Sequence, residues 1–168
     1  MKDVLTIGAD NLHVIKWFID VAFGVHPDFR SHSGGVMTMG TGAIQSMSQK
    51  QKLNTTNTCS AELVGADDAA NLILWTKLFM EAQGYEIREN ILFQDNKSTI
   101  LLIENGKRSS GKRTRALNIR YFFLTDQRDK GNLDVKYCPT DDMLGDYMTK
   151  TTQGKKFCGF QKEIMGME

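Results

Sequence analysis

The chain has 168 residues, and its 21 basic and 20 acidic side chains leave a formal net charge of +1 at pH 7. This length predicts a single domain that buries a sizeable core without disulfides or a structural metal. The balanced charge excludes a strong overall field that would attract a polyanion. The three cysteines, Cys59, Cys138 and Cys158, form no C-x-x-C pair, which indicates reduced thiols in an intracellular compartment. No segment is long and apolar enough to span a membrane.

The first half of the chain predicts three antiparallel strands and a long helix. Residues 1–12 carry little hydrophobic pattern and are predicted to be an N-terminal tail or the stub of a preceding linker. Apolar residues recur at every second position over 14–25, which predicts a strand. A glycine-rich turn joins two further predicted strands at 35–39 and 43–48. Helical spacing of apolar residues then predicts a helix over 60–83.

The second half predicts strands that alternate with helices. A short apolar strand at 91–94 leads into a helix at 97–104. The remaining predicted elements are a basic loop at 105–111, expected to be the most mobile segment, a helix at 115–129, a strand at 133–138 and a short helix at 142–150. A three-strand meander followed by βα units predicts an α/β fold, with a mixed five-stranded sheet flanked by helices, over residues 13–168.

Two acidic side chains in the first half have competing interpretations. Asp20 lies inside the first predicted strand, where a half-buried charge is costly unless it is paired or bound to a metal. A salt bridge to Lys16 and metal binding explain Asp20 equally well. Glu62 falls in the first turn of the long helix, where a carboxylate offsets the helix dipole. That simple interpretation is the better one for Glu62 taken alone.

Two acids in the second half are equally open when each is taken alone. Asp95 follows a strand, where it can either cap the next helix or hold a metal ion. Asp146 lies on the short helix at 142–150, where solvent exposure is the default, and Asp141 and Asp142 compete with it. Together the acids are more informative, because paired Mg²⁺ ions about 4 Å apart need several carboxylates. With Asp95 in such a cluster, helix capping falls to Asn96.

A series of short motifs in a fixed order, over about residues 12–166, carries a resemblance to a known family. The motifs are Ile19-Asp20-Val21-Ala22-Phe23, Ser31-His32-Ser33-Gly34-Gly35, Gln49-Lys50-Gln51-Lys52, Ser60-Ala61-Glu62-Leu63-Val64-Gly65, Ile73-Leu74-Trp75-Thr76, Gln94-Asp95-Asn96-Lys97-Ser98, Lys112-Arg113-Thr114-Arg115, Ile119-Arg120-Tyr121-Phe122-Phe123 and Gly145-Asp146-Tyr147-Met148-Thr149-Lys150. In this order they resemble the ribonuclease H domain of a copia-type LTR retrotransposon polyprotein, which implies a ribonuclease H-like fold.

The resemblance implies an endonuclease that hydrolyses the RNA strand of RNA–DNA hybrids during retrotransposon reverse transcription. Catalysis would use two Mg²⁺ ions, with Mn²⁺ as a substitute, and no small-molecule cofactor. The family's catalytic, metal-binding acids match Asp20, Glu62, Asp95 and Asp146. The implied partners are the hybrid and an upstream reverse transcriptase domain of the same polyprotein, with no membrane. Residues 1–12 would then be a polyprotein linker stub. The implied location is the cytoplasm, in a virus-like particle, with the nucleus as a second compartment.

Nucleic-acid contacts are expected mainly from basic side chains, because these neutralise phosphates and release counterions. The predicted contacts are Lys50, Lys52, Asn96, Ser98, Lys112, Arg113 and Arg115. A solvated loop explains Lys107 and Arg108 equally well. Five aromatic side chains are expected in the core: Trp17, Trp75, Phe79, Tyr121 and Phe122.

Three departures from the family pattern favour an alternative function. The chain has Ala116 where the family has His, Thr151-Thr152 where it has Pro-Leu, and Cys59-Ser60 in the segment before the glutamate. The alternative is a catalytically weak or inactive remnant that binds nucleic acid or packs on a polymerase domain.

Overall fold

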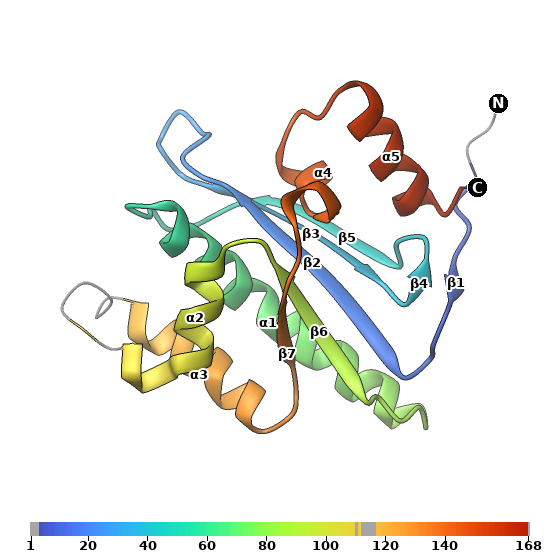
Figure 1. The fold of residues 1–168 in the computed structure, drawn as a ribbon, viewed down its shortest axis with the longest axis horizontal. Coiled ribbons are helices and arrows are strands. Elements are labelled where there is room, and N and C mark those ends of the chain that lie inside the picture. Colours follow the sequence, from blue (N-terminus) through green and yellow to red (C-terminus); the bar gives the residue numbers. More distant parts are fainter. Residues whose placement is uncertain (1–3, 110, 112–116, 168) are drawn as a thin grey trace.

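A computed structural model describes residues 4–109, 111 and 117–167. Its main sheet has the strand order β5-β3-β2-β6-β7 (Figure 1). The strands are β2 (Val14–Ala22), β3 (His32–Thr38), β5 (Gln45–Lys50), β6 (Glu89–Gln94) and β7 (Asp134–Tyr137). The first three are antiparallel, whereas β6 runs parallel to both β2 and β7. The predicted α/β fold with a mixed five-stranded sheet is therefore confirmed.

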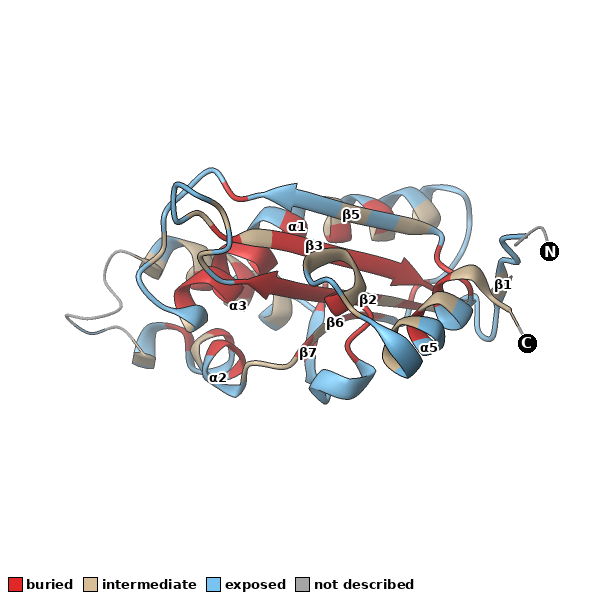
Figure 2. Cartoon of the chain, turned by 90° about the horizontal axis from the view of Figure 1, so that it is seen from above, coloured by how far each residue is buried: buried red, intermediate tan, exposed pale blue. Residues whose placement is uncertain are grey.

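Helices cover both faces of this sheet (Figures 1 and 2). The larger core cluster joins one face to three helices, and a smaller cluster joins the other face to two helices nearer the C-terminus. The three helices are α1 (Thr58–Ala82), α2 (Lys97–Asn105) and α3 (Asn118–Asp129), and the two are α4 (Asp146–Thr149) and α5 (Gly154–Met165). Short pieces complete the described chain: β1 (Gly8–Ala9), β4 (Gly40–Thr41) and the 3₁₀ turns η1 (Gly106–Ser109) and η3 (Thr140–Asp142).

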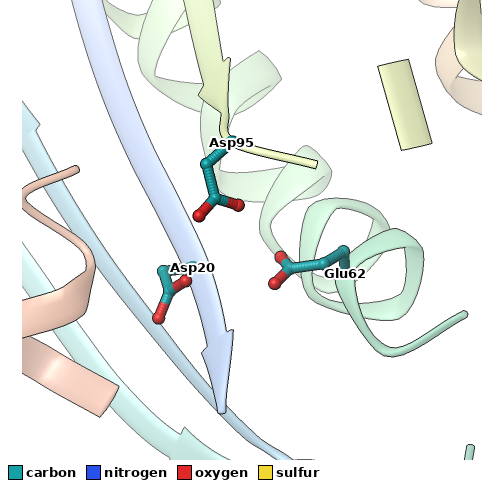
Figure 3. Close-up of side chains that lie close together, drawn as sticks. All are labelled: Asp20, Glu62 and Asp95. Atoms are coloured by element: carbon teal, nitrogen blue, oxygen red, sulfur yellow. The ribbon is translucent and has the colours of Figure 1, made fainter. Parts of the chain in front are cut away.

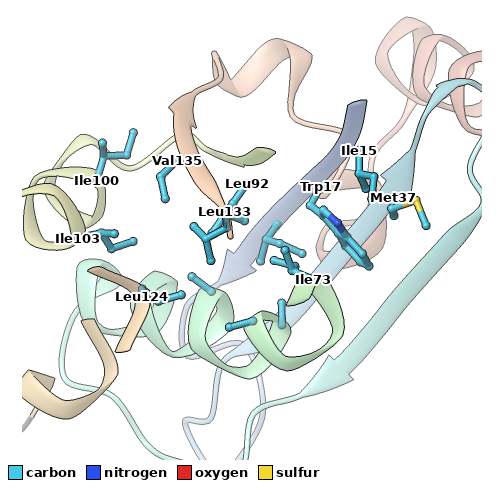
Figure 4. Packing of buried hydrophobic residues seen from close by; sticks show 14 of the residues in the cluster. Ile15, Trp17, Met37, Ile73, Leu92, Ile100, Ile103, Leu124, Leu133 and Val135 are labelled. Carbon is cyan, nitrogen blue, oxygen red and sulfur yellow. The ribbon is translucent and has the colours of Figure 1, made fainter. Parts of the chain in front are cut away.

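Strand β2 lies between the two core clusters because its side chains alternate between the faces of the sheet. Ile15, Trp17 and Ile19 are at most 1% exposed and pack with α1, α2 and α3 on one face (Figure 4). Phe18 packs on the other face, against the cluster that contains Phe160 of α5. Each of these large apolar side chains contributes about 1.5–3 kcal/mol on burial. The alternation of apolar side chains that predicted this strand therefore also places β2 between the two core clusters.

Two asparagines set the starts of the helices that follow the strands. The Asn57 side chain accepts a hydrogen bond from the Ser60 N–H at 2.8 Å, which begins α1 at Thr58. Glu62 therefore lies just after the first turn, and the prediction that it falls in the first turn is wrong, because the helix begins two residues earlier than predicted. Asn96 Oδ1 accepts from the N–H groups of Ser98 and Thr99 at 3.0 and 3.2 Å, which begins α2. The prediction that Asn96 caps this helix is confirmed, and it leaves the Asp95 side chain available for other contacts.

The C-terminal part of the chain differs most from the prediction. The helix predicted at 142–150 is two separate pieces, η3 and α4, and the helix α5 that follows was not predicted. The loop predicted at 105–111 contains a 3₁₀ turn over Gly106–Ser109. At the other end, the strand predicted at 14–25 stops at Ala22, because Gly24 turns the backbone with a φ of +62°.

Two aromatic side chains predicted in the core lie on the surface. Trp75 and Phe79 are 56% and 46% exposed, and their rings stack on each other at a centroid distance of 5.1 Å. Helical periodicity shows which residues lie on the same side of a helix. It does not show how much of a long helix is covered by the sheet. The other three aromatic predictions are correct, since Trp17 and Tyr121 are buried and Phe122 is partly buried against the core.

The N-terminal segment lies against the C-terminal helix. β1 pairs with β4, and the Thr6 N–H donates to the Met165 carbonyl at 2.9 Å (Figure 1). Residues 8–9 therefore form a short strand within the segment that was predicted to be a tail. The domain boundary at residue 12 stays a prediction. Among the described residues, no helix combines the length and the hydropathy needed to cross a bilayer.

Candidate active site

Three carboxylates from three elements converge at one edge of the sheet. Asp20 lies near the carboxyl end of β2, and Asp95 follows the end of the parallel neighbour β6. Glu62 reaches the same place from α1. One oxygen from each carboxylate lies within 4.8 Å of the others, and Figure 3 shows the three side chains pointing toward one another. This edge of an open α/β sheet is a common place for ligands.

The environment of Glu62 opposes its ionisation. Burial, followed by the neighbouring charges of Asp20 and Asp95, raises the pKa of Glu62 to about 9. Gln94 Nε2 donates to Glu62 Oε2 at 3.3 Å, which lowers the pKa by a smaller amount. In the ion-free chain Glu62 therefore holds a proton at neutral pH. A divalent cation among these oxygens would reverse that preference, because it favours the ionised carboxylate.

Asp20 is held by groups that follow the last strand. Its carboxylate is 1% exposed and accepts hydrogen bonds from Thr149 Oγ1 and, at 3.4 Å, from Lys150 Nζ. Burial, together with the charges of Asp146 and Asp95, raises the pKa of Asp20 overall, although these two contacts lower it. The alternative salt bridge from Asp20 to Lys16 is wrong, since Lys16 pairs with Asp10 at 3.8 Å. Hard carboxylate oxygens at this spacing are the ligands that Mg²⁺ prefers, so the residues fit such an ion.

Among the described residues, Asp146 is not part of the group formed by Asp20, Glu62 and Asp95. Its carboxylate is instead bound by two lysines. Lys150 Nζ donates to Asp146 Oδ1 at 2.5 Å, and Lys156 Nζ donates to Oδ2 at 2.9 Å. Burial raises the pKa of Asp146, but the hydrogen bonds and positive charges of the two lysines lower it overall. Because Lys150 also contacts Asp20, a lysine links the fourth acid to the first.

Glycine allows α4 to lie directly on the strands that carry the site. A Cβ atom on Gly145 would lie 2.8 Å from the Asp20 backbone nitrogen and 3.0 Å from the Phe18 carbonyl oxygen. A Cβ atom on Gly34 would lie 2.6 Å from Thr149 Cγ2. Contacts this short would push the helix away, so these two glycines set the distance between Asp20 and the α4 segment.

Asp141 and Asp142, the other two acids considered in this segment, are exposed and are not part of the three-acid group. The Asp141 side chain is 97% exposed and lies 3.8 Å from Lys156, and Asp142 is also exposed. Asp95 accepts a hydrogen bond from Thr140 Oγ1 at 3.0 Å, so η3 contacts the three-acid group through a hydroxyl and not through its acids.

Four of the residues predicted to contact nucleic acid lie in the described part of the chain. Lys50 pairs with Asp28 at 2.7 Å, and Lys52 is exposed near a cavity of about 560 Å³ that the two lysines help to line. Asn96 uses its side chain as a helix cap, and Ser98 is exposed. The predicted contacts Lys112, Arg113 and Arg115, and the departure Ala116, lie outside the described residues.

Five side chains that touch the acids were missed from the sequence: Gln94, Thr140, Thr149, Lys150 and Lys156. Lys150 had a usable signal, because a lysine four residues after Asp146 on a helix lies over that carboxylate. Lys156 had none, because the helix that carries it was not predicted.

Comparisons with known proteins agree with this geometry. The chain is 28% identical over 166 residues to the retrovirus-related Pol polyprotein of transposon TNT 1-94 from Nicotiana tabacum, which covers 98% of the chain. It is also 28% identical over 139 residues, 82% of the chain, to the Ty1-NL2 Gag-Pol polyprotein of Saccharomyces cerevisiae. The chain spans only 12% and 8% of these two polyproteins. No protein-family profile matches it.

A solved structure identifies the fold. LC11-RNase H1 in complex with RNA/DNA hybrid superposes with a TM-score of 0.58 over 80% of this chain and 92% of that one, at 13% identity. The predicted ribonuclease H-like fold is thereby confirmed, and the predicted resemblance to a retrotransposon polyprotein agrees with the two relatives. The chain has the ribonuclease H fold, and its sequence is similar to the Pol polyproteins of retrotransposons.

Proposed function

We propose that the chain is a Mg²⁺-dependent endonuclease that hydrolyses the RNA strand of RNA–DNA hybrids during reverse transcription of a retrotransposon. One observation carries the proposal: Asp20, Glu62 and Asp95 converge, from three elements, at one edge of a ribonuclease H fold. The similarity to retrotransposon Pol polyproteins supports the biological setting. A related fold solved with an RNA/DNA hybrid supports the substrate class.

The four predicted acids take different roles in this proposal. Two bound ions would supply an activated water and stabilise the charge on the leaving 3′ oxygen. Asp20 and Asp95, at the ends of neighbouring strands, would each offer carboxylate oxygens to the bound metal. Glu62 gives up its proton when a cation binds and also faces the 2′-hydroxyl of the scissile nucleotide, the group that distinguishes RNA from DNA. Asp146 would add a further carboxylate to help hold the metal that activates the water.

Substrate binding and cellular setting are also proposals. Phosphates of the hybrid would contact the predicted set Lys50, Lys52, Asn96, Ser98, Lys112, Arg113 and Arg115, and this contact would weaken with salt. A polymerase domain earlier in the same polyprotein would deliver the hybrid. The setting would be a cytoplasmic virus-like particle, with the nucleus as a second compartment, and Mn²⁺ would replace Mg²⁺ in vitro.

Cleavage of matched duplexes tests the proposal. An RNA–DNA hybrid, an RNA duplex and a DNA duplex of one sequence are incubated with the purified chain and Mg²⁺, and each strand carries its own label. We expect cleavage of the RNA strand of the hybrid alone, and no cleavage in EDTA. An intact hybrid that is nevertheless bound would instead support the alternative of an inactive remnant.

A further inference from the structure

Lys150 places a positive charge between two buried acids. Its Nζ lies 2.5 Å from Asp146 Oδ1, 3.3 Å from Asp20 Oδ2 and 3.4 Å from Asp20 Oδ1. Asp146 and Asp20 are 2% and 1% exposed. Two buried carboxylates facing one another would be strongly destabilising without a partner charge. Lys150 supplies that charge in the ion-free chain.

The position of Lys150 follows from the helix and its packing. Asp146 begins α4 and Lys150 follows its last residue, so the lysine lies one turn from the acid on the same side. Thr149, the preceding residue, is bound to Asp20 through its hydroxyl, which keeps this end of the helix beside β2. Burial opposes the charge of Lys150, but the hydrogen bond from Lys150 to Asp146 and the charge of Asp20 raise its pKa overall. Lys150 is therefore an ammonium cation at neutral pH.

We infer that Lys150 acts as an internal cation that occupies the Asp20–Asp146 position and must move away before these carboxylates can share a divalent ion. The inference rests on the proposed function, because it takes both acids as ligands. Lys150 contacts both oxygens of Asp20 and one oxygen of Asp146. An ion shared by these two acids would therefore compete with Lys150 at both of its ligands, whereas an ion in the three-acid group would meet Lys150 only through Asp20. The two ion positions are thus unequal. The group of Asp20, Glu62 and Asp95 fills first, and the Asp20–Asp146 position fills second with lower affinity.

Lys156 provides an internal comparison. It also donates to Asp146, at 2.9 Å, but its other contacts are the Thr140 carbonyl at 3.3 Å, Asp141 at 3.8 Å and the Phe160 ring at 5.2 Å. Among the described contacts of Lys156 there is none to Asp20. Removing Lys156 therefore changes the charge around Asp146 and leaves Lys150 in place between the two acids.

Binding of Mn²⁺ to the full chain, without nucleic acid, tests the inference. Free Mn²⁺ is followed by electron paramagnetic resonance during titration. Lys150→Gln is expected to bind the second ion about tenfold more tightly, because apparent affinity is reduced by the fraction of molecules in which the position is open. The exposed Lys155→Gln on α5 removes the same charge and should match wild type. A second-ion affinity of Lys150→Gln equal to wild type, or matched by Lys156→Gln, would overturn the inference.

A second measurement uses the wild-type chain alone, so it stands even if Lys150→Gln fails to fold. Acetylation of lysines is quantified by mass spectrometry in EDTA and in saturating Mn²⁺. Lys150 is expected to react several-fold faster with Mn²⁺, because its amino group has left the carboxylates, whereas Lys155 should react at one rate. Equal reactivity of Lys150 in both conditions contradicts the inference.

The two proposals can fail separately. An uncut hybrid together with tighter binding of the second ion by Lys150→Gln would reject the proposed function and keep Lys150 as the competing cation. A cleaved hybrid with unchanged ion binding would reject only the role of Lys150.

Discussion

Asp95→Asn is expected to lower the rate of hybrid cleavage by about 10³-fold or more, a loss of about 4 kcal/mol of transition-state stabilisation. Asp95 is one of the three carboxylates that converge, and it is the least buried of the three. The amide keeps the size of the side chain and can still accept from Thr140, but it no longer offers a charged oxygen to an ion.

The fold should survive this substitution. Removing a negative charge beside Asp20 relieves repulsion in the ion-free chain, so thermal unfolding in EDTA should occur at an equal or higher temperature. Hybrid affinity, measured by fluorescence anisotropy in EDTA, should also be retained. The control is Asp141→Asn, since Asp141 is an exposed acid near the same edge. Cleavage at the wild-type rate by Asp95→Asn would contradict the assigned role of Asp95.

Glu62 makes the stability of the ion-free chain depend on pH. Burial and the neighbouring acids raise its pKa to about 9, against 4.5 for the ordinary side chain. Between these values the folded chain holds a proton that the unfolded chain has lost. Stability from this group is therefore complete below about pH 4.5 and declines as pH rises toward about 9, by up to about 1.4 kcal/mol per pH unit.

Denaturant unfolding in EDTA at about pH 7 and about pH 8.5 measures this effect. Because the pKa of Asp146 is lowered, Asp146 stays ionised across this pH range, and its contribution to the unfolding free energy is constant. We expect wild type to lose about 1–2 kcal/mol of unfolding free energy across it. Glu62→Gln should lose much less, and Mg²⁺ should restore wild type more than the variant. The same pH dependence in Glu62→Gln would show that another group carries it.

The central part of the fold could be predicted because its signals are local. Alternation along β2 identified both the strand and its buried face, and Asp20 was conspicuous as a charge within that pattern. Asn96 follows a strand and precedes an apolar helix, so capping chemistry identified its role. In such places the residues of one short segment decide the structure.

The rest depends on contacts between distant segments. Lys150 meets Asp20 across 130 positions of sequence, and that meeting requires α4 to dock on β2 and β3. The sequence therefore predicted that all four acids form one cluster. In the structure, three of them converge, and Asp146 is bound by lysines. Trp75 and Phe79 show the same limit, because only the sheet decides which part of α1 is covered.

Asp20, Glu62 and Asp95 are proposed to form a metal centre, and anomalous scattering from crystals soaked in Mn²⁺ tests this most directly. We predict a peak within coordination distance of an oxygen from each of the three side chains, and its loss in Asp95→Asn crystals. A Mn²⁺ peak at other residues, with none among these three in the wild-type chain, would contradict the claim.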